Sequence, residues 1–181
     1  MANRSCYAMV KIQDADVEKF RVQAGQTFYP GDIVKLETLD TGLSNNIEVY
    51  SPTPCASVTA DRFCIIPNQR FEQLTDGRRP TGNPDVSTYT FTAGQTIEVI
   101  RLRKNYTFFI SDDCLDNKGS VAPAVAVKLI PRVGDYQLAT ATTGGSSITV
   151  LNIEKRESQP SGGQFGASFI DGNIARVTEG Y

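Results

Sequence analysis

The chain has 181 residues, of which 40% are hydrophobic and 21% are charged, with a formal net charge of −2 and a sequence pI of about 5.2. This length is enough for one hydrophobic core, or for one core with a smaller lobe. The composition is that of a globular chain and not of a disordered one. The nearly balanced charge excludes a general attraction to nucleic acid or to acidic membranes, so a charged polymer would have to bind at a local patch.

The sequence shows no targeting or membrane segment. Residues 1–6 lack the apolar stretch of a signal peptide. The most apolar later run, residues 121–130, contains Pro123 and Lys128 and is too short to span a bilayer. We therefore expect synthesis and folding in the cytoplasm, and no membrane partner.

Alternation of apolar and polar residues with a period of two recurs along the chain and predicts strands. In the first half it covers residues 6–12 and residues 34–36. Helical periodicity hardly occurs, and we expect helix only in short pieces at residues 14–20 and 68–74.

Residues 97–103 show a different pattern. Ile97 and Val99 share one face of the expected strand, and Ile100 and Leu102 then take the other face. This change of phase predicts either a β-bulge or a strand that is buried on both faces.

The second half of the chain continues the strand pattern. The expected strands lie at residues 106–110, 125–129, 148–153, 167–170 and 173–177. Phe109 makes the first of them apolar on both sides.

Glycine, proline, aspartate and asparagine punctuate these runs and predict tight turns. The turns are expected at residues 30–32, 76–77, 82–84, 134–135, 144–145 and 171–173. Two longer polar stretches, residues 75–87 and 158–166, are expected to be exposed loops.

The tetrapeptide Ala-Gly-Gln-Thr occurs twice, at residues 24–27 and 93–96. Each copy follows a run with an aromatic residue and precedes another strand. Two similar hairpin turns, in which glycine accepts a positive φ, are the simpler interpretation. A duplicated β unit is the alternative, but four residues are little evidence for a repeat.

Short, regularly spaced strands indicate an all-β fold, a β-barrel or β-sandwich with long polar loops and little helix. We expect residues 1–13 to form an N-terminal arm and first strand. Residues 14–181 are expected to form a single β-rich domain, with room for a loop-rich insertion around residues 53–87.

The chain has no histidine, and its cysteines form no Cys-x-x-Cys pair. A zinc site would need all four thiolates to converge from distant points: Cys6, Cys55, Cys64 and Cys114. We therefore expect free thiols in a reducing compartment, no metal site and no cofactor.

Acidic residues cluster at Asp112, Asp113 and Asp116, next to Asn117. Oxygen ligands at this density could hold calcium. Their order does not match the EF-hand pattern, and no glutamate closes the loop, so a solvated turn is the simpler interpretation. Because the commonest general base is also absent, we expect no catalytic residues and no enzyme activity.

Basic residues gather at Arg101, Arg103 and Lys104, with Tyr106 and Phe108 just beyond. Interleaved cations and aromatic rings can form a stacking groove for single-stranded nucleic acid. An exposed strand end is the simpler interpretation in a chain whose net charge is negative. We expect no nucleic-acid partner.

The layout resembles that of the decoration proteins, also called cement or auxiliary capsid proteins, of tailed bacteriophages. The resemblance covers most of the length. It rests on a polar start (residues 1–5), a Gly-Asp step into an apolar strand (28–36), a central stretch (91–99, then 106–112) and a closing strand (170–177).

The resemblance implies a β-barrel or β-tulip-like fold that docks on assembled capsid subunits, often as a trimer. It also implies an N-terminal arm that reaches across a neighbouring subunit. The expected partner is the major capsid protein or another virion protein, and the expected location is the capsid surface after synthesis in the host cytoplasm.

Three hypotheses therefore stand side by side. The first is a virion structural protein of the capsid, with a tail or neck component as a variant. The second is a binding module for glycan or cell surface, in which exposed tyrosines such as Tyr50 and Tyr136 stack on sugar rings. The third, with least support, is an enzyme that works through the carboxylates around Asp112.

Overall fold

The computed structural model describes residues 4–39, 49–57, 62–68, 90–116, 121–142, 149–160 and 169–180. Within these ranges the regular structure is nearly all β-strand, without an α-helix. The only helical pieces there are two 3₁₀ turns, η1 (Asp14–Asp16) and η3 (Asp112–Cys114). The predicted all-β fold with little helix is confirmed.

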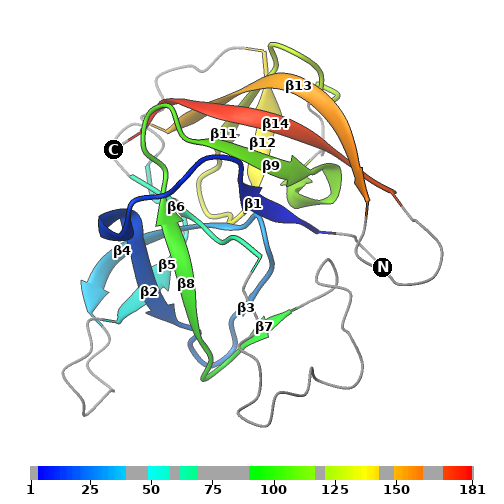
Figure 1. The fold of residues 1–181 in the computed structure, drawn as a ribbon. Coiled ribbons are helices and arrows are strands. Elements are labelled where there is room, and N and C mark those ends of the chain that lie inside the picture. The colour runs from blue at the N-terminus through cyan, green and yellow to red at the C-terminus, as the bar shows by residue number, and fades with distance from the viewer. Residues whose placement is uncertain are drawn as a thin grey trace, which may run out of the picture.

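Seven strands form a curled sheet in the upper half of Figure 1. Their order across the sheet is β1 (Cys6–Ala8), β9 (Thr107–Ser111), β14 (Phe169–Glu179), β13 (Val150–Pro160), β11 (Lys128–Pro131), β12 (Leu138–Ala141) and β10 (Leu115–Asp116). Neighbouring strands run antiparallel except β10 and β12, which are parallel. The long β13–β14 hairpin forms the spine of this sheet.

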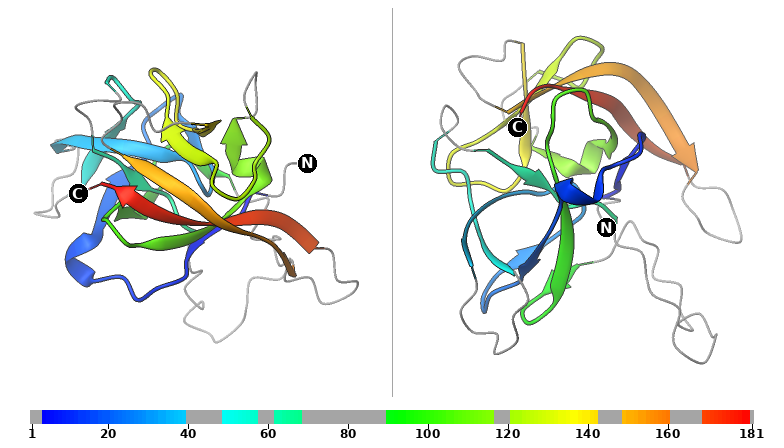
Figure 2. Two further views of the ribbon diagram at one scale, coloured as in Figure 1. Left: turned by 90° about the horizontal axis from the view of Figure 1, so that it is seen from above. Right: turned by 60° about the vertical axis from the view of Figure 1, so that its left-hand side comes forward.

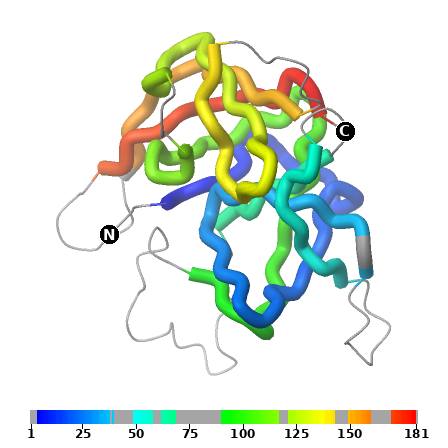
Figure 3. Tube along the Cα trace, turned by 180° about the vertical axis from the view of Figure 1, so that it is seen from behind, coloured from blue at the N-terminus to red at the C-terminus, as the bar shows by residue number. Residues whose placement is uncertain are grey.

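Five strands close into a barrel below the sheet (Figure 1). Their order is β2 (Val17–Arg21), β5 (Tyr50–Thr53), β4 (Ile33–Leu39), β6 (Cys64–Ile65) and β8 (Thr96–Arg101). Figure 3 shows from behind that the segment of β11 and β12 lies above the barrel strands β4 and β5. A barrel and a sheet thus stack on one another.

The two Ala-Gly-Gln-Thr copies form similar turns. Gly25 and Gly94 have φ values of +82° and +88°, so glycine does accept the left-handed conformation there. In each copy the glutamine side-chain oxygen accepts a hydrogen bond from the backbone N–H three residues earlier, at 3.1 Å for Gln26 and 2.6 Å for Gln95.

The turns are not hairpins, because the strands on either side of each belong to different sheets. After the first turn the chain enters β3 (Thr27–Phe28), and the second turn follows β7 (Phe91–Thr92). β3 and β7 pair with each other beside the lower part of the barrel (Figure 1). Phe28 of β3 and Phe91 of β7 pack together with apolar residues of the barrel strands.

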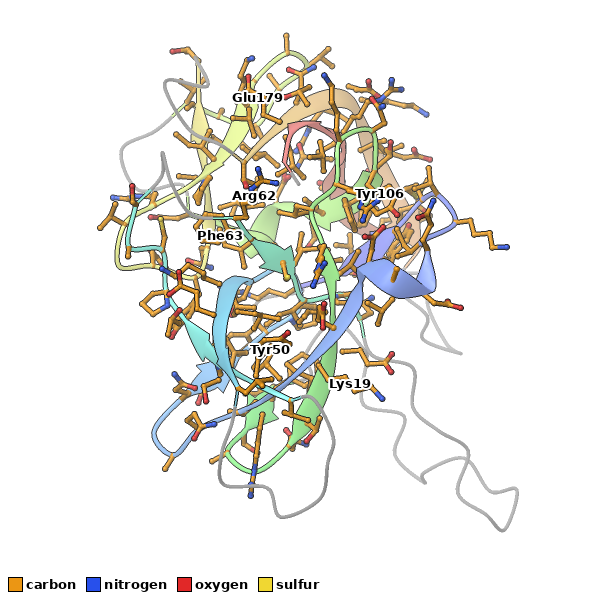
Figure 4. The ribbon with its side chains drawn as sticks, turned by 90° about the vertical axis from the view of Figure 1, so that its left-hand side faces the viewer. Lys19, Tyr50, Arg62, Phe63, Tyr106 and Glu179 are labelled. Atoms are coloured by element: carbon orange, nitrogen blue, oxygen red, sulfur yellow. The ribbon has the colours of Figure 1, made fainter. Side chains whose placement is uncertain are left out.

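Two apolar clusters fill the molecule. The barrel cluster includes Phe20, Phe28 and Phe91, which are at most 2% exposed. The second cluster lies between the barrel and the curled sheet and includes Phe108 of β9 and Phe63, which Figure 4 labels.

Three adjacent barrel strands, β4, β6 and β8, separate the two clusters, and we call them the shared wall. Consecutive residues on each strand point into different clusters. The pairs, barrel side first, are Val34 and Ile33, Cys64 and Ile65, and Val99 and Ile100.

The change of phase in residues 97–103 therefore marks where the strand becomes buried on both faces, past the exposed Thr96 and Glu98. Ile97 and Val99 face the barrel interior, and Ile100 and Leu102 face the second cluster. β8 pairs with β2 and β6 without a register shift, so no bulge is involved.

The predicted helix at residues 14–20 is wrong beyond its first turn. Only η1 is helical, and the chain then enters β2, which pairs with β8 from Val17 opposite Ile100 to Arg21 opposite Thr96. Tertiary pairing overrides the weak local pattern, because it places Phe20 inside the barrel. Of the other predicted helix only residue 68 lies within the described residues.

The predicted turn at residues 171–173 is also wrong. These residues continue β14, so the described part of the strand expected at residues 167–170 and the strand expected at 173–177 are one. The reason is packing, because a Cβ on Gly172 would lie 2.6 Å from Cζ of Phe109 and 2.8 Å from the Ile110 carbonyl oxygen. Glycine is needed here for close approach and not for a turn.

Three strand boundaries and one loop range also differ from the predicted ones. The first strand ends at Ala8, and Val10 is exposed. β11 begins at Lys128, three residues after the predicted start at Val125, and β13 extends to Pro160, into the loop predicted at residues 158–166. β6 lies inside the expected insertion at residues 53–87 and is a barrel strand.

Substitution of Gly172 by alanine should destabilise the fold by about 1–3 kcal/mol, because the new methyl group overlaps the Phe109 ring and a backbone carbonyl. The matched control is Gly94→Ala, where nothing lies within 4 Å of the added Cβ and only left-handed strain of about 1 kcal/mol applies. Chemical denaturation of both variants measures the difference. Equal costs would contradict the packing role of Gly172.

Candidate functional site

The N-terminal segment is fixed to the body by a buried ion pair. Nη1 of Arg4 lies 2.7 Å from Oδ1 of Asp32, with 13% and 4% of the two side chains exposed. The guanidinium carbon lies 4.6 Å from the centre of the Tyr29 ring, so the ring covers the cation. Asp32 Oδ2 accepts a further hydrogen bond from the Tyr29 N–H at 2.9 Å.

A second set of hydrogen bonds holds the next two residues. Ser5 and Ser111 exchange two bonds, from the Ser5 N–H to Oγ of Ser111 at 2.8 Å and from the Ser111 N–H to the Ser5 carbonyl at 2.9 Å. Asn68 binds the backbone of Cys6, because its Oδ1 accepts from the Cys6 N–H and its own N–H donates to the Cys6 carbonyl. The side-chain nitrogen of Asn68 also donates to Oγ of Ser5 at 2.9 Å. The expected polar arm of residues 1–5 is thus part of the body at Arg4 and Ser5.

We call the contacts of Arg4 and Ser5 with Asp32 and Ser111 the junction. Burial is the main cause of the pKa shifts of the titratable groups around it. Desolvation raises the pKa of Asp32 to about 6, although the Arg4 charge and the Tyr29 N–H oppose the rise and Asp135 adds to it. Burial likewise raises the pKa of the Cys114 thiol to about 11 and that of the Cys6 thiol well above its usual value. Both thiols are therefore protonated near neutral pH and are poor nucleophiles.

The β13–β14 hairpin projects beyond the rest of the sheet. β14 pairs with β9 only as far as Gly172, whereas its pairing with β13 continues to Phe169 opposite Pro160. We call residues 158–160 and 169–171 the hairpin tip, and Figures 1 and 2 show it on the same side as the start of β1. Phe169 in this tip is 63% exposed.

A charged clamp holds the base of the hairpin. Arg156 binds both carboxylate oxygens of Asp112, and its Nη2–Oδ2 distance is 2.7 Å. Asn173 lies between them, because its Oδ1 is 2.8 Å from Nη1 of Arg156 and its Nδ2 is 2.9 Å from Oδ1 of Asp112. A bidentate pair with a bridging amide fixes the hairpin against η3.

The acidic cluster does not converge on one site. Asp112 is bound by Arg156, and Asp116 is paired with Arg132, which directly follows β11. Asn117 lies outside the described residues. Within the described ranges, no group of three or more aspartate, glutamate, cysteine or histidine side chains is placed to hold a metal ion.

The two arginines of the basic cluster are paired with neighbouring carboxylates. Arg101 pairs with Glu18, and Nε of Arg103 lies 2.7 Å from Oδ1 of Asp16. Phe108 is fully buried, so the stacking groove considered for Tyr106 and Phe108 is wrong for that ring.

Tyr106 contacts the same carboxylate as Arg103, that of Asp16. Its hydroxyl donates to Asp16, which is fully buried, and Figure 4 shows Tyr106 beside the connection between β8 and β9. This cluster joins η1 to that connection.

The two tyrosines expected to stack on sugars are half-buried parts of the barrel. Tyr50 and Tyr136 both pack against the barrel cluster, and the Tyr136 ring meets Phe28 edge to face at 4.7 Å. The interpretation of these two rings as an exposed platform is wrong. The glycine pair at residues 144–145 and the loop at residues 75–87 lie outside the described residues.

Sequence reasoning missed the residues that build the junction and the clamp. Arg4, Arg156 and Asn173 carry no local motif, and their partners lie 17 to 61 residues away along the chain. Asp112, as part of an acidic cluster, and the Gly31-Asp32 step stood out in the sequence, but the partner of neither did.

No helix in the described part of the chain is long and apolar enough to cross a membrane. A scan against protein-family models, a search of curated proteins and a search of solved structures each found no match.

The raised pKa of Asp32 predicts a specific pH dependence. The folded protein holds this proton more tightly than the unfolded chain, whose aspartate pKa is 3.8, so Asp32 contributes stability below about pH 4 that is lost as the pH rises through about 6. Relative to Asp32→Asn, the parent should lose up to about 3 kcal/mol of unfolding free energy between pH 4 and 7. Urea denaturation at several pH values measures this difference.

Arg4→Met is the matched control for that measurement. Arg4 lowers the pKa of Asp32, so its removal should move the pH window upward. A window that stays in place, or a parent and an Asp32→Asn variant with parallel pH profiles, would refute the assignment.

Proposed function

We propose that this chain is a virion structural protein that binds and stabilises an assembled viral capsid, as a decoration or cement protein does. Its partner is the major capsid protein or another virion protein, and it acts at the capsid surface. It works as a homo-oligomer, for which a trimer is favoured by the family resemblance.

One observation carries the proposal: the described residues expose apolar surface on a projecting hairpin, and the groups considered for chemistry, the cysteines with Asp112 and Asp116, are buried or paired. Phe169 stands out on the hairpin tip, whereas the four cysteines are all buried. Asp112 and Asp116 each bind an arginine. Such a surface suits adhesion better than chemistry.

Rigidity at the base of the hairpin supports the same function. The clamp of Arg156, Asp112 and Asn173 holds the hairpin in one orientation before any partner arrives, which lowers the entropy cost of docking. A protein that binds only the assembled shell stabilises that shell by mass action. Many copies on a symmetric lattice multiply a modest contact energy.

Co-sedimentation with assembled shells of the encoding virus tests the proposal, with unassembled subunits, tails and necks as comparison samples. We expect retention on heads, and loss of about tenfold in affinity for Phe169→Ser, because an exposed aromatic ring at a contact contributes about 1–2 kcal/mol. The matched control is Val133→Ser, which removes an apolar side chain that is 66% exposed at the β11–β12 turn.

If the protein co-sediments only with tails or necks, it is a structural component of that part of the virion and not of the capsid. No retention on any assembled particle would refute the proposal. Equal losses for Phe169→Ser and Val133→Ser would refute the role of the hairpin tip.

A further inference from the structure

The second half of β13 has an open edge. On the side of β11, β13 is paired only up to Ile153, which exchanges hydrogen bonds with Ala126 and Val127 at 2.9 and 3.0 Å. From Glu154 to Pro160 no strand of the described chain pairs on that side. An open edge of this length is a template for another strand.

The pairing of β14 tells which of its backbone groups face β13. Val177 exchanges hydrogen bonds with β9 and its preceding turn, through the carbonyl of Tyr106 and the N–H of Asn105. Because these groups alternate along an antiparallel strand, Ile174 and Gly172 direct theirs towards β13.

The residues of β13 opposite those two are Lys155 and Glu157. They therefore bond to β14, and the intervening Arg156 and the following Ser158 direct their N–H and carbonyl groups to the open edge. An antiparallel strand that binds there must place, opposite Arg156 and Ser158, residues whose own backbone N–H and carbonyl groups point to β13.

When the incoming strand is β13 of a second copy, outward-facing residues must lie opposite outward-facing residues. The two-fold axis of the pairing then passes through a residue and not between two residues. A register centred on Lys155 places two lysines opposite each other, and one centred on Glu157 places two glutamates there. A register centred on Arg156 places Lys155 opposite Glu157 of the second copy, twice by symmetry. Cross-strand pairs of opposite charge stabilise a sheet, and like charges destabilise it.

In the monomer, Nζ of Lys155 lies 3.4 Å from Oε2 of Glu157, so both side chains are on one face. The self-pairing thus makes a square of alternating charges. Arg156 meets its own copy at the axis, but each Arg156 is neutralised by its Asp112.

An apolar segment borders the same edge. Residues 121–126 read Val-Ala-Pro-Ala-Val-Ala, and five of the six are exposed, Val125 to 60%. Ala126 bonds to Ile153 where the open edge begins, so residues 121–126 would meet Gln159 of the second copy. The contact would therefore cover apolar surface that the described chain leaves in water.

From the open edge, its hydrogen-bond direction and its charges, we infer that two copies of this chain join edge to edge through β13. The strands run antiparallel in the register centred on Arg156, with a ladder from Glu154 to Ser158. The interface is isologous and closes after two copies. It does not depend on the capsid function and is tested on the purified chain alone.

Sedimentation analysis over a range of concentrations is the first test. We expect a dimer, or an even-numbered particle where a three-fold contact is also made. Lys155→Glu and Glu157→Lys should each raise the dissociation constant at least about tenfold, since each puts like charges opposite twice. The double variant should restore association, and Lys19→Glu, a charge reversal on barrel strand β2, should leave it unchanged.

Cross-linking tests the register directly. In Lys155→Cys with Glu157→Cys, the two new thiols face each other across the axis at a Cα separation of about 4.5 Å, which a disulfide spans. All four native cysteines are buried and remain out of reach of a mild oxidant. The control is Lys19→Cys with Arg21→Cys, at the same spacing on a strand inside the closed barrel.

A disulfide-linked dimer of the first variant and not of the control supports the register. A monomer or an odd-numbered particle at every concentration would overturn the inference. So would a double charge reversal as weak as its parent single variants, or the absence of the linked dimer in an otherwise folded protein.

Discussion

The shared wall of β4, β6 and β8 is the constraint on which the rest of the structure depends. Where these strands pass between the two apolar clusters they have no solvent-exposed face, because neighbouring residues such as Ile33 and Val34 pack into different clusters. A sheet buried on both faces needs near-continuous apolar sequence and tolerates few polar residues. The barrel and the curled sheet therefore cannot separate without exposing one side of this wall to water.

The polar junction lies at the end of the same wall. Asp32 directly precedes Ile33, and its carbonyl accepts a hydrogen bond from the Ile66 N–H at 2.9 Å. Gly31 donates to the Ile66 carbonyl at 2.8 Å, and a Cβ at Gly31 would overlap the Cys114 side chain. The Arg4 ion pair thus ties the N-terminal segment to the point where β4 and β6 leave the barrel, next to the start of η3.

The sequence predicted those parts of the fold that rest on local patterning. Alternation located the strands around Val34 and Phe108, and the phase change at residues 97–103 located the wall strand β8. Each of these patterns shows which face of a strand packs against apolar side chains. Neighbouring residues alone determine it, because successive side chains on a strand point to opposite faces.

The sequence could not predict features that depend on distant partners. Gly172 has the composition of a turn, and only the Phe109 ring beneath it makes it a strand residue. Arg156 gains its role from Asp112, 44 residues away, and Arg4 from Asp32, 28 residues away. Charged residues are usually solvated, so without the fold nothing separates these arginines from the rest.

The strand edges of the molecule are treated in contrasting ways. The barrel closes on itself and has none, and at Cys6 the outer edge of β1 is capped by Asn68, with bonds of 2.6 and 3.0 Å. Among the strands that the structure describes, only the second half of β13 combines length, an open ladder and two side chains of opposite charge, Lys155 and Glu157, on one face. Charged side chains on an edge strand usually prevent it from pairing with strands of other proteins.

The charges on β13 are arranged so that they also permit one pairing. A row of like charges would repel every copy of itself, whereas Lys155 and Glu157 repel the registers centred on either of them and attract in the one between. The same side chains that protect the edge from other strands can therefore select its partner, which is how specificity arises from a modest contact energy.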